Sequence, residues 1–217
     1  MSSHNLTGQI IVVDDCSRDE TAKAAEEAGG DLPAQISLKV IRNNKHRGKG
    51  YAVRTGIQQS SGRYVMFADS GCCVPYEYIL AGLELIKSGT CDIAHASRKL
   101  KETRIVNPQH IYRRICSRLF HWFIVHFMGM PAEFTDTQCG FKIYKGDIGR
   151  DLYSQCITDG FMFDIEIVLR ALKQGCRIKE FPIQWSCDFD TRLSPTRNLY
   201  RVLSELLAIR KNIKNSD

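Results

Sequence analysis

Short apolar runs alternate with segments of helical periodicity along the first half of the chain. Runs rich in β-branched residues predict strands over residues 9–14, 37–42, 63–68 and 92–96. Between them, apolar residues at helical spacing predict helices over residues 17–28, 51–60 and 76–88. This alternation predicts βαβ units, and therefore an α/β fold with a mostly parallel sheet flanked by helices.

The pattern changes after residue 107, where a longer helix is expected. It covers residues 107–130 and is basic early and aromatic later. Further strands are predicted over residues 141–144 and 177–185, and further helices over residues 161–175 and 199–213. No internal repeat or linker-like segment interrupts the chain. Residues 1–217 are therefore predicted to form a single domain.

Two of the predicted strands end in acids. Asp14 and Asp15 follow the first strand, and Asp69 follows the third. Ser17 stands three residues before Glu20, the spacing of a capping box, so Ser17 is expected to cap the first helix. Ligands of open parallel sheets bind at the carboxyl ends of strands, which makes these acids candidates for a binding site.

Composition and charge narrow the class of protein. Hydrophobic residues make up 43% and charged residues 25%, a globular composition that excludes a disordered chain. Lys and Arg number 30 against 24 Asp and Glu, and the resulting net charge of +6 is too weak to imply nucleic-acid binding. It suits a basic face for phosphate groups or for an anionic membrane surface.

The nine cysteines do not indicate a disulfide scaffold or a metal centre. Their number is odd, and neither a Cys-x-x-Cys pair nor a Cys/His cluster occurs. They are expected to be reduced thiols in a cytosolic compartment. No signal peptide is evident, and the apolar stretch over residues 119–130 is too short to span a bilayer. The chain is expected to be soluble or peripheral to a membrane.

Five sequence elements, in order, carry a specific resemblance. Residues 12–21 read VVDDCSRDET, residues 43–56 read NNKHRGKGYAVRTG, and residues 62–69 read GRYVMFAD. Residues 136–142 read DTQCGFK, and residues 161–166 read FMFDIE. Together they resemble family 2 (GT-A fold) glycosyltransferases, closest to the subgroup that glycosylates polyprenyl phosphates and especially to dolichyl-phosphate β-glucosyltransferases. The resemblance runs from about residue 9 to about residue 195.

The resemblance implies a GT-A, Rossmann-like domain that here lacks the family's usual first strand, since only eight residues precede Gln9. It also implies a site for a nucleotide-sugar donor. The residues expected to bind that donor are Asp14, Asp15, Ser17, Lys49, Asp69 and Arg192.

Asp69 is also the expected ligand of a divalent metal ion, Mg²⁺ or Mn²⁺, that would hold the donor diphosphate. The family places a second acid two residues later, in an Asp-x-Asp motif. This chain has Gly71 there, which should weaken or alter metal binding.

Asp136 and Asp164 are the expected catalytic acids. In inverting transferases an acid that faces the anomeric carbon serves as general base. A lipid phosphate is already anionic, so Asp136 could instead position the acceptor or the sugar hydroxyls. By resemblance, Arg98, Arg113 and Ser117 are expected around the acceptor phosphate.

The resulting hypothesis is an inverting hexosyltransferase. It would move glucose from UDP-glucose onto a polyprenyl or dolichyl phosphate at the cytoplasmic face of a membrane, which residues 110–130 and 199–214 would contact peripherally. Two alternatives stay open. One is a family 2 transferase with a glycan or another non-lipid acceptor, and the other is a non-catalytic nucleotide-sugar-binding remnant.

Overall fold

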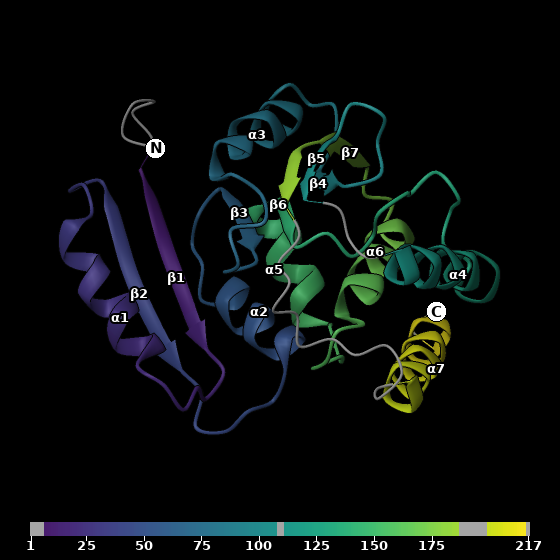
Figure 1. Ribbon diagram of the computed structural model, residues 1–217, viewed down its shortest axis with the longest axis horizontal. Coiled ribbons are helices and arrows are strands. Elements are labelled where there is room, and N and C mark those ends of the chain that lie inside the picture. The colour runs from purple at the N-terminus through teal and green to yellow at the C-terminus, as the bar shows by residue number, and fades with distance from the viewer. Residues whose placement is uncertain (1–6, 108–110, 187–198, 216–217) are drawn as a thin grey trace.

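The computed structural model describes residues 7–107, 111–186 and 199–215, without the side chain of residue 113. Its strands form three groups (Figure 1). The first is a parallel pair of β1 (Gly8–Asp14) and β2 (Ile36–Arg42). The central sheet has the order β3 (Tyr64–Ala68), β6 (Phe141–Lys145), β4 (Ile93–Ser97) and β7 (Ile178–Pro182). The third group pairs β5 (Arg104–Asn107) with β8 (Gln184–Ser186).

The direction of the strands brings two of the predicted site segments to one edge. β6 runs antiparallel to both β3 and β4, while β4 and β7 are parallel. β3 and β4 therefore point the same way, and Asp69 and Arg98 follow their carboxyl ends. The α/β class with helix-flanked sheets is confirmed, with β6 as the antiparallel strand in the central sheet.

Helices cover both faces of the central sheet. On one face lie η3 (Tyr76–Tyr78) and α3 (Ile79–Lys87), whose Ile79 and Ile86 pack on β4, β6 and β7. On the other face lie α2 (Lys49–Gln58), α5 (Gly146–Ser154) and α6 (Phe163–Lys173), packed around Phe67 and Tyr144. α1 (Thr21–Ala28) packs against the β1–β2 pair and is followed by η2 (Gly29–Asp31).

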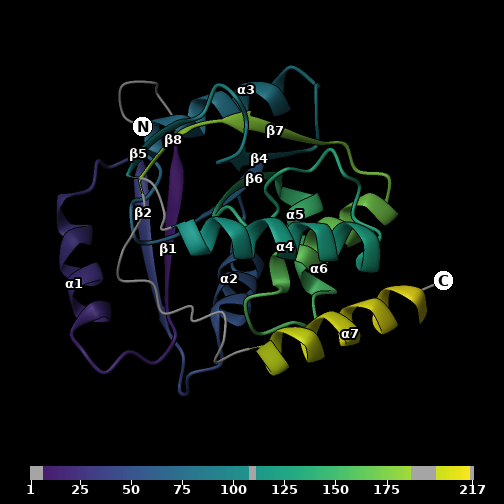
Figure 2. The same ribbon diagram turned by 45° about the vertical axis from the view of Figure 1, so that its right-hand side comes forward.

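Two long helices form a further layer outside α6, as Figure 2 shows. They are α4 (Ile111–Met128) and α7 (Leu199–Asn215). Ile124 of α4 and Leu206 and Ile209 of α7 are buried against Ile165 and Val168 of α6. The inner faces of both helices belong to the core, and their outer faces remain at the surface.

The predicted elements are confirmed with a few differences. Ser17 is not a helix cap: α1 begins at Thr21 without a side-chain cap, and the Ser17 N–H instead donates to Asp14 Oδ1 at 2.9 Å. α5 was not predicted because it contains Gly146 and Gly149, which disfavour helices, yet Leu152 and Tyr153 secure it to the core. The long helix begins at Ile111, since residues 104–107 form β5 against β8.

The cysteines in the described part of the chain form no disulfide with one another. Among the described residues, no helix is both long and apolar enough to cross a membrane.

Candidate active site

Asp14 and Asp15 end the first strand in very different surroundings. Asp14 is buried, and its Oδ1 accepts the Ser17 N–H. Its Oδ2 is also buried and accepts no hydrogen bond from the described residues, although Arg42 Nε lies 3.4 Å away. The contact with Arg42 is an ion pair rather than a hydrogen bond, so Asp14 Oδ2 keeps an unused acceptor position, which is unusual for a buried oxygen.

The loop that follows β2 donates hydrogen bonds to the Asp15 carboxylate. The carboxylate accepts hydrogen bonds from Asn43 Nδ2 at 2.8 Å, from the Arg47 N–H at 3.1 Å and from the Gly48 N–H at 2.7 Å. Burial raises the pKa of Asp15, but these hydrogen bonds outweigh it, and the pKa lies below its ordinary value. The carboxylate is therefore ionised at neutral pH and orders the Gly-rich loop.

The backbone between β1 and α1 turns sharply at Cys16. Its φ of 65° lies in the left-handed region, which an L-residue other than Gly adopts at a cost. This turn brings the Ser17 N–H back onto Asp14. Ser17 therefore lies beside Asp14 and contacts it through its backbone N–H.

Most of the polar groups in the Gly-rich loop are used within the protein. The N–H groups of Gly50 and Tyr51 donate to the carbonyls of Gly160 and Asp159 at 3.2 and 3.1 Å. The Asp159 carboxylate accepts from Arg47 Nη2 at 2.7 Å and from Arg54 Nη2 at 2.5 Å. The two arginines share the Asp159 carboxylate, whereas Lys49, at the start of α2, pairs with a different acid at the end of β3.

Lys49 and Asp69 form an ion pair at the carboxyl end of β3. The Lys49 Nζ lies 2.6 Å from Asp69 Oδ1, and both side chains are partly exposed, at 27% and 41%. Gly140 on the neighbouring segment leaves room for the carboxylate, because a Cβ at that position would lie 2.0 Å from Asp69 Oδ2. The pair is both ordered and reachable from solvent.

A second pair, Lys142 with Asp164, is buried, and its Asp164 is close enough to Lys49 and Asp69 for their charges to act on it. Burial raises the pKa of Asp164, against the opposing effect of Lys142 and Lys49. His95, the strand partner of Lys142, is also buried, and burial together with Lys142 lowers its pKa well below the ordinary value. Asp164 is therefore near the donor residues but enclosed, which suits it to positioning rather than to contact with a substrate.

The described residues do not fit a two-carboxylate metal site. Gly71 supplies no carboxylate, and Asp69 already holds the Lys49 ammonium. Within the described ranges, no three His, Cys, Asp or Glu side chains gather in a way that could hold a metal ion.

Asp136 is clamped by Arg98 at the end of β4. Arg98 Nε and Nη2 donate to the two carboxylate oxygens at 2.6 and 2.7 Å, and the Arg98 N–H adds a third hydrogen bond at 2.9 Å. Burial raises the pKa of Asp136, but the Arg98 charge and hydrogen bonds outweigh burial and lower it to about 2. A carboxylate held in this way is a weak base at neutral pH.

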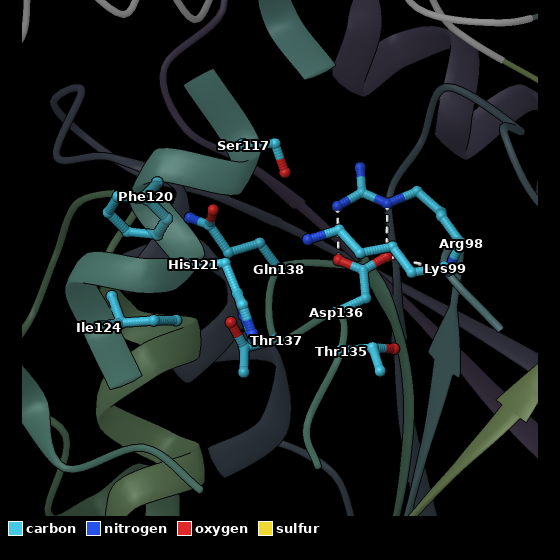
Figure 3. A pocket seen from close by; sticks show the side chains of 10 residues that line it. All are labelled: Arg98, Lys99, Ser117, Phe120, His121, Ile124, Thr135, Asp136, Thr137 and Gln138. Carbon is cyan, nitrogen blue, oxygen red and sulfur yellow. Dashed lines mark hydrogen bonds and ion pairs between the residues drawn. The ribbon is translucent and has the colours of Figure 1, made fainter. Parts of the chain in front are cut away.

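Figure 3 shows the small pocket beside this clamp. Its enclosed volume is about 20 Å³, room for about one water molecule. Lys99, Ser117 and His121 line it together with Arg98 and Asp136. Partial burial and the nearby Lys99 charge lower the pKa of His121, so its ring is neutral at pH 7. The pocket therefore places the Lys99 ammonium and the uncharged Ser117 and His121 side chains beside the Arg98–Asp136 ion pair, in a space for a single water molecule.

Three of the predicted site residues, Arg98, Ser117 and Asp136, line one pocket in the structure. Arg192 and the side chain of Arg113 lie outside the described residues. The sequence analysis missed Lys99, His121, Lys142 and Asp159. Lys99 follows the predicted Arg98, and His121 lies one helical turn after Ser117, so the spacing in the helix could have indicated His121.

The outer faces of α4 and α7 expose large apolar side chains. On α4, Ile111, Ile115, Leu119 and Trp122 are 74%, 53%, 63% and 61% exposed, and their spacing places them on one face. Ser117, His121 and Ile124 lie on the opposite face, toward the pocket and the core. On α7, Tyr200, Leu203 and Leu207 form a second exposed stripe.

Known proteins resemble the chain along most of its length. A human dolichyl-phosphate beta-glucosyltransferase is 29% identical over 218 residues, covering 94% of this chain and 64% of the relative. The Dictyostelium discoideum protein of the same name is 26% identical over 206 residues, covering 93% of this chain and 62% of the relative. The chain thus spans less than two thirds of these relatives' own lengths.

Solved structures share the fold at lower identity. Glucosyl-3-phosphoglycerate synthase from Mycobacterium tuberculosis in complex with UDP has a TM-score of 0.66 and 15% identity, covering 93% of this chain and 68% of that one. The same synthase with Mn²⁺ and UDP-glucose also has a TM-score of 0.66, at 14% identity and with 93% and 67% of the two chains covered. These likenesses show a GT-A-like fold.

Residues 5–148 match the family described as glycosyl transferase family 2. This range includes both acids after β1, the Gly-rich loop, Asp69, and the Arg98–Asp136 clamp. The chain belongs to glycosyl transferase family 2.

Proposed function

We propose that the chain is the catalytic domain of an inverting glucosyltransferase that moves glucose from UDP-glucose onto a polyprenyl phosphate such as dolichyl phosphate. Family membership supports transfer from a nucleotide sugar. The names of the curated relatives support glucose and a dolichyl phosphate.

The observation that best supports a lipid acceptor is that the two opposite faces of α4 differ in their side chains. One face contributes Ser117 and His121 to the pocket that Lys99 and the Arg98–Asp136 pair also line, and the opposite face exposes Ile111, Ile115 and Leu119. A helix of this kind can lie in a membrane interface with its apolar face in the lipid. A lipid phosphate would then reach the mouth of the pocket while its hydrocarbon chain stayed in the membrane.

The donor would bind at the carboxyl ends of β1 and β3. Asp14 Oδ2 would accept a hydrogen bond from the base or the ribose, while Asp15 and Ser17 shape the loop around it. Lys49 and Asp69 would lie at the diphosphate, with Arg192 as a further cation predicted from the sequence. Asp164 would support Lys49 through its charge.

The chemistry is a single displacement at the anomeric carbon. An oxygen of the acceptor phosphate forms a bond to C1, the bond from C1 to the diphosphate oxygen breaks, and UDP leaves with the electron pair. The attacking oxygen is already anionic, so no proton has to be removed. Asp136 accordingly acts as a positioning residue that fixes Arg98, and Lys99, Ser117, His121 and Arg113 would receive the acceptor phosphate.

A Mg²⁺ or Mn²⁺ ion at this site would find one protein carboxylate, Asp69, and would take its other ligands from the diphosphate and water. It would also have to compete with Lys49 for that carboxylate. The proposed reaction therefore includes no step that depends on the ion.

The proposed location is the cytoplasmic face of a membrane, held peripherally by residues 110–130 and 199–214. The exposed apolar stripes on α4 and α7 support this, and the net charge of +6 favours anionic lipid headgroups.

Transfer of radiolabelled glucose from UDP-glucose into an organic-extractable product tests the proposal. The expected result is label in the lipid fraction only when polyprenyl phosphate is present. Lys99→Ala should reduce the rate at least about tenfold through loss of a charged hydrogen-bond donor. The exposed Lys87→Ala on α3 is the control and should leave the rate unchanged. Label on a glycan instead would favour a non-lipid acceptor, and no transfer with intact UDP binding would favour a binding remnant.

A further inference from the structure

Lys49 is paired differently from the two arginines near it, at the carboxyl end of β3. Arg47 and Arg54, on the same loop and helix, are both paired with Asp159. The Lys49 ammonium instead lies 2.6 Å from Asp69 Oδ1 and within 6 Å of the rings of Phe67 and Phe163, at 5.7 and 5.9 Å. An ammonium has three hydrogens, and Asp69 takes one of them. Two hydrogen-bond donors are left for a ligand, on a side chain that is 27% exposed.

The charges around Lys49 are balanced before any ligand binds. Lys49 pairs with Asp69, and Lys142 pairs with Asp164 nearby. A divalent ion bound to Asp69 would share that carboxylate with the Lys49 ammonium. The two positive charges would then lie a few ångströms apart and repel each other strongly. A second acid could offset this repulsion, but residue 71 is glycine.

The absence of the second acid is not forced by the backbone. Gly71 is not among the residues with positive φ, so an L-residue could adopt its conformation. The backbone conformation at residue 71 therefore does not require glycine, and the effect of Gly71 is to remove a carboxylate from the site.

We propose that the Lys49 ammonium, oriented by Asp69, donates hydrogen bonds to the donor diphosphate in place of a divalent metal ion. The inference rests on the proposed donor site and adds that donor binding is independent of metal. The chemical class of ligand is a nucleoside diphosphate, whose leaving-group charge the same ammonium would stabilise as the glycosidic bond breaks.

Calorimetry of UDP binding tests this without any transfer step. With EDTA present, UDP should bind the unaltered protein within about threefold of its affinity in Mn²⁺. Lys49→Met, which keeps the length of the side chain but removes its charge, should weaken binding in EDTA at least tenfold. Lys49→Arg should retain most of the affinity, and Lys87→Met should match the unaltered protein.

A double variant, Lys49→Met with Gly71→Asp, restores two acids and removes the competing ammonium. UDP binding by this variant should become dependent on Mn²⁺, and the signal of free Mn²⁺ in electron paramagnetic resonance should fall when the protein and UDP are added together. Circular dichroism would establish that each variant is folded.

Tight UDP binding by the unaltered protein only with Mn²⁺, or full affinity of a folded Lys49→Met in EDTA, would overturn the inference and leave the proposed transferase in place. Absence of UDP binding both with EDTA and with Mn²⁺ would overturn the inference and the proposed transferase together.

Discussion

Asp14 and Asp15 are identical side chains, adjacent in the sequence, whose carboxylates have very different hydrogen-bond partners. The sequence shows two acids after a strand, and this alone predicts a site. Only the loop after β2, which reaches Asp15 with Asn43, Arg47 and Gly48, occupies one of them and leaves a buried oxygen of the other without a hydrogen-bond donor from the described residues.

The contribution of Asp136 to the unfolding free energy is predicted to depend on pH. Its pKa of about 2 in the folded protein lies below the ordinary value of 3.8, which corresponds to about 2 kcal/mol of stabilisation. Because the folded pKa is depressed, this stabilisation is present above about pH 4 and is lost as the pH falls toward 2. The difference in unfolding free energy between the unaltered protein and Asp136→Asn should shrink over that window, as measured by urea unfolding.

The exposed Asp147, which pairs with Arg150 at the surface, provides the control. Asp147→Asn should change the unfolding free energy little at any pH. A difference for Asp136→Asn that stays constant from pH 5 to pH 2.5 would show that the carboxylate charge is not what stabilises the clamp.

At the scale of elements, helix α2 depends on close approach to the loop before α6. A Cβ on Gly50 would lie 2.4 Å from the Thr158 carbonyl oxygen and 2.8 Å from the Gly160 carbonyl oxygen. Both are backbone atoms, so the conflict cannot be relieved by turning a side chain. This contact keeps the Gly-rich loop and Asp159 together.

Gly50→Ala should therefore lower the unfolding free energy by about 1–3 kcal/mol, the usual cost of overpacking. Gly30→Ala is the matched control, because nothing lies within 4 Å of its added Cβ. Thermal unfolding of the two variants compares them directly. Equal stability of Gly50→Ala and Gly30→Ala would contradict the close approach.

For the whole molecule, the exposed stripe on α4 predicts membrane binding. Leu119 and Trp122 are 63% and 61% exposed, so replacing both by Ala should leave the fold intact. Burying side chains of this size in lipid is worth about 2 kcal/mol each, so Leu119→Ala with Trp122→Ala should bind vesicles at least about tenfold more weakly. Sedimentation with vesicles of phosphatidylglycerol and phosphatidylcholine measures this.

Ile157, an exposed apolar residue outside α4 and α7, serves as control, and Ile157→Ala should bind vesicles like the unaltered protein. Raising the salt to 0.5 M should weaken binding as well, since screening reduces the attraction of a basic protein to anionic lipid. Equal binding by the α4 double variant and the unaltered protein would exclude this face as the membrane contact.

The sequence by itself determined most of the elements and the family. Alternating strand and helix patterns are local, because each depends on side chains a few residues apart, and the family motifs are contiguous. α5 and β5 were not predicted because contacts with distant parts of the chain stabilise them. α5 packs into the core through Leu152, and β5 pairs with β8.

Only the tertiary structure decided which charges are available to a ligand. Arg47, Lys49 and Arg54 look equivalent in the sequence, but Asp159 lies more than 100 residues from the two arginines and accepts hydrogen bonds from both. Arg98 and Asp136 are likewise 38 residues apart and neutralise each other. Whether a charged side chain serves a substrate or the fold depends on its partners in space, and folding brings those partners together from distant parts of the chain.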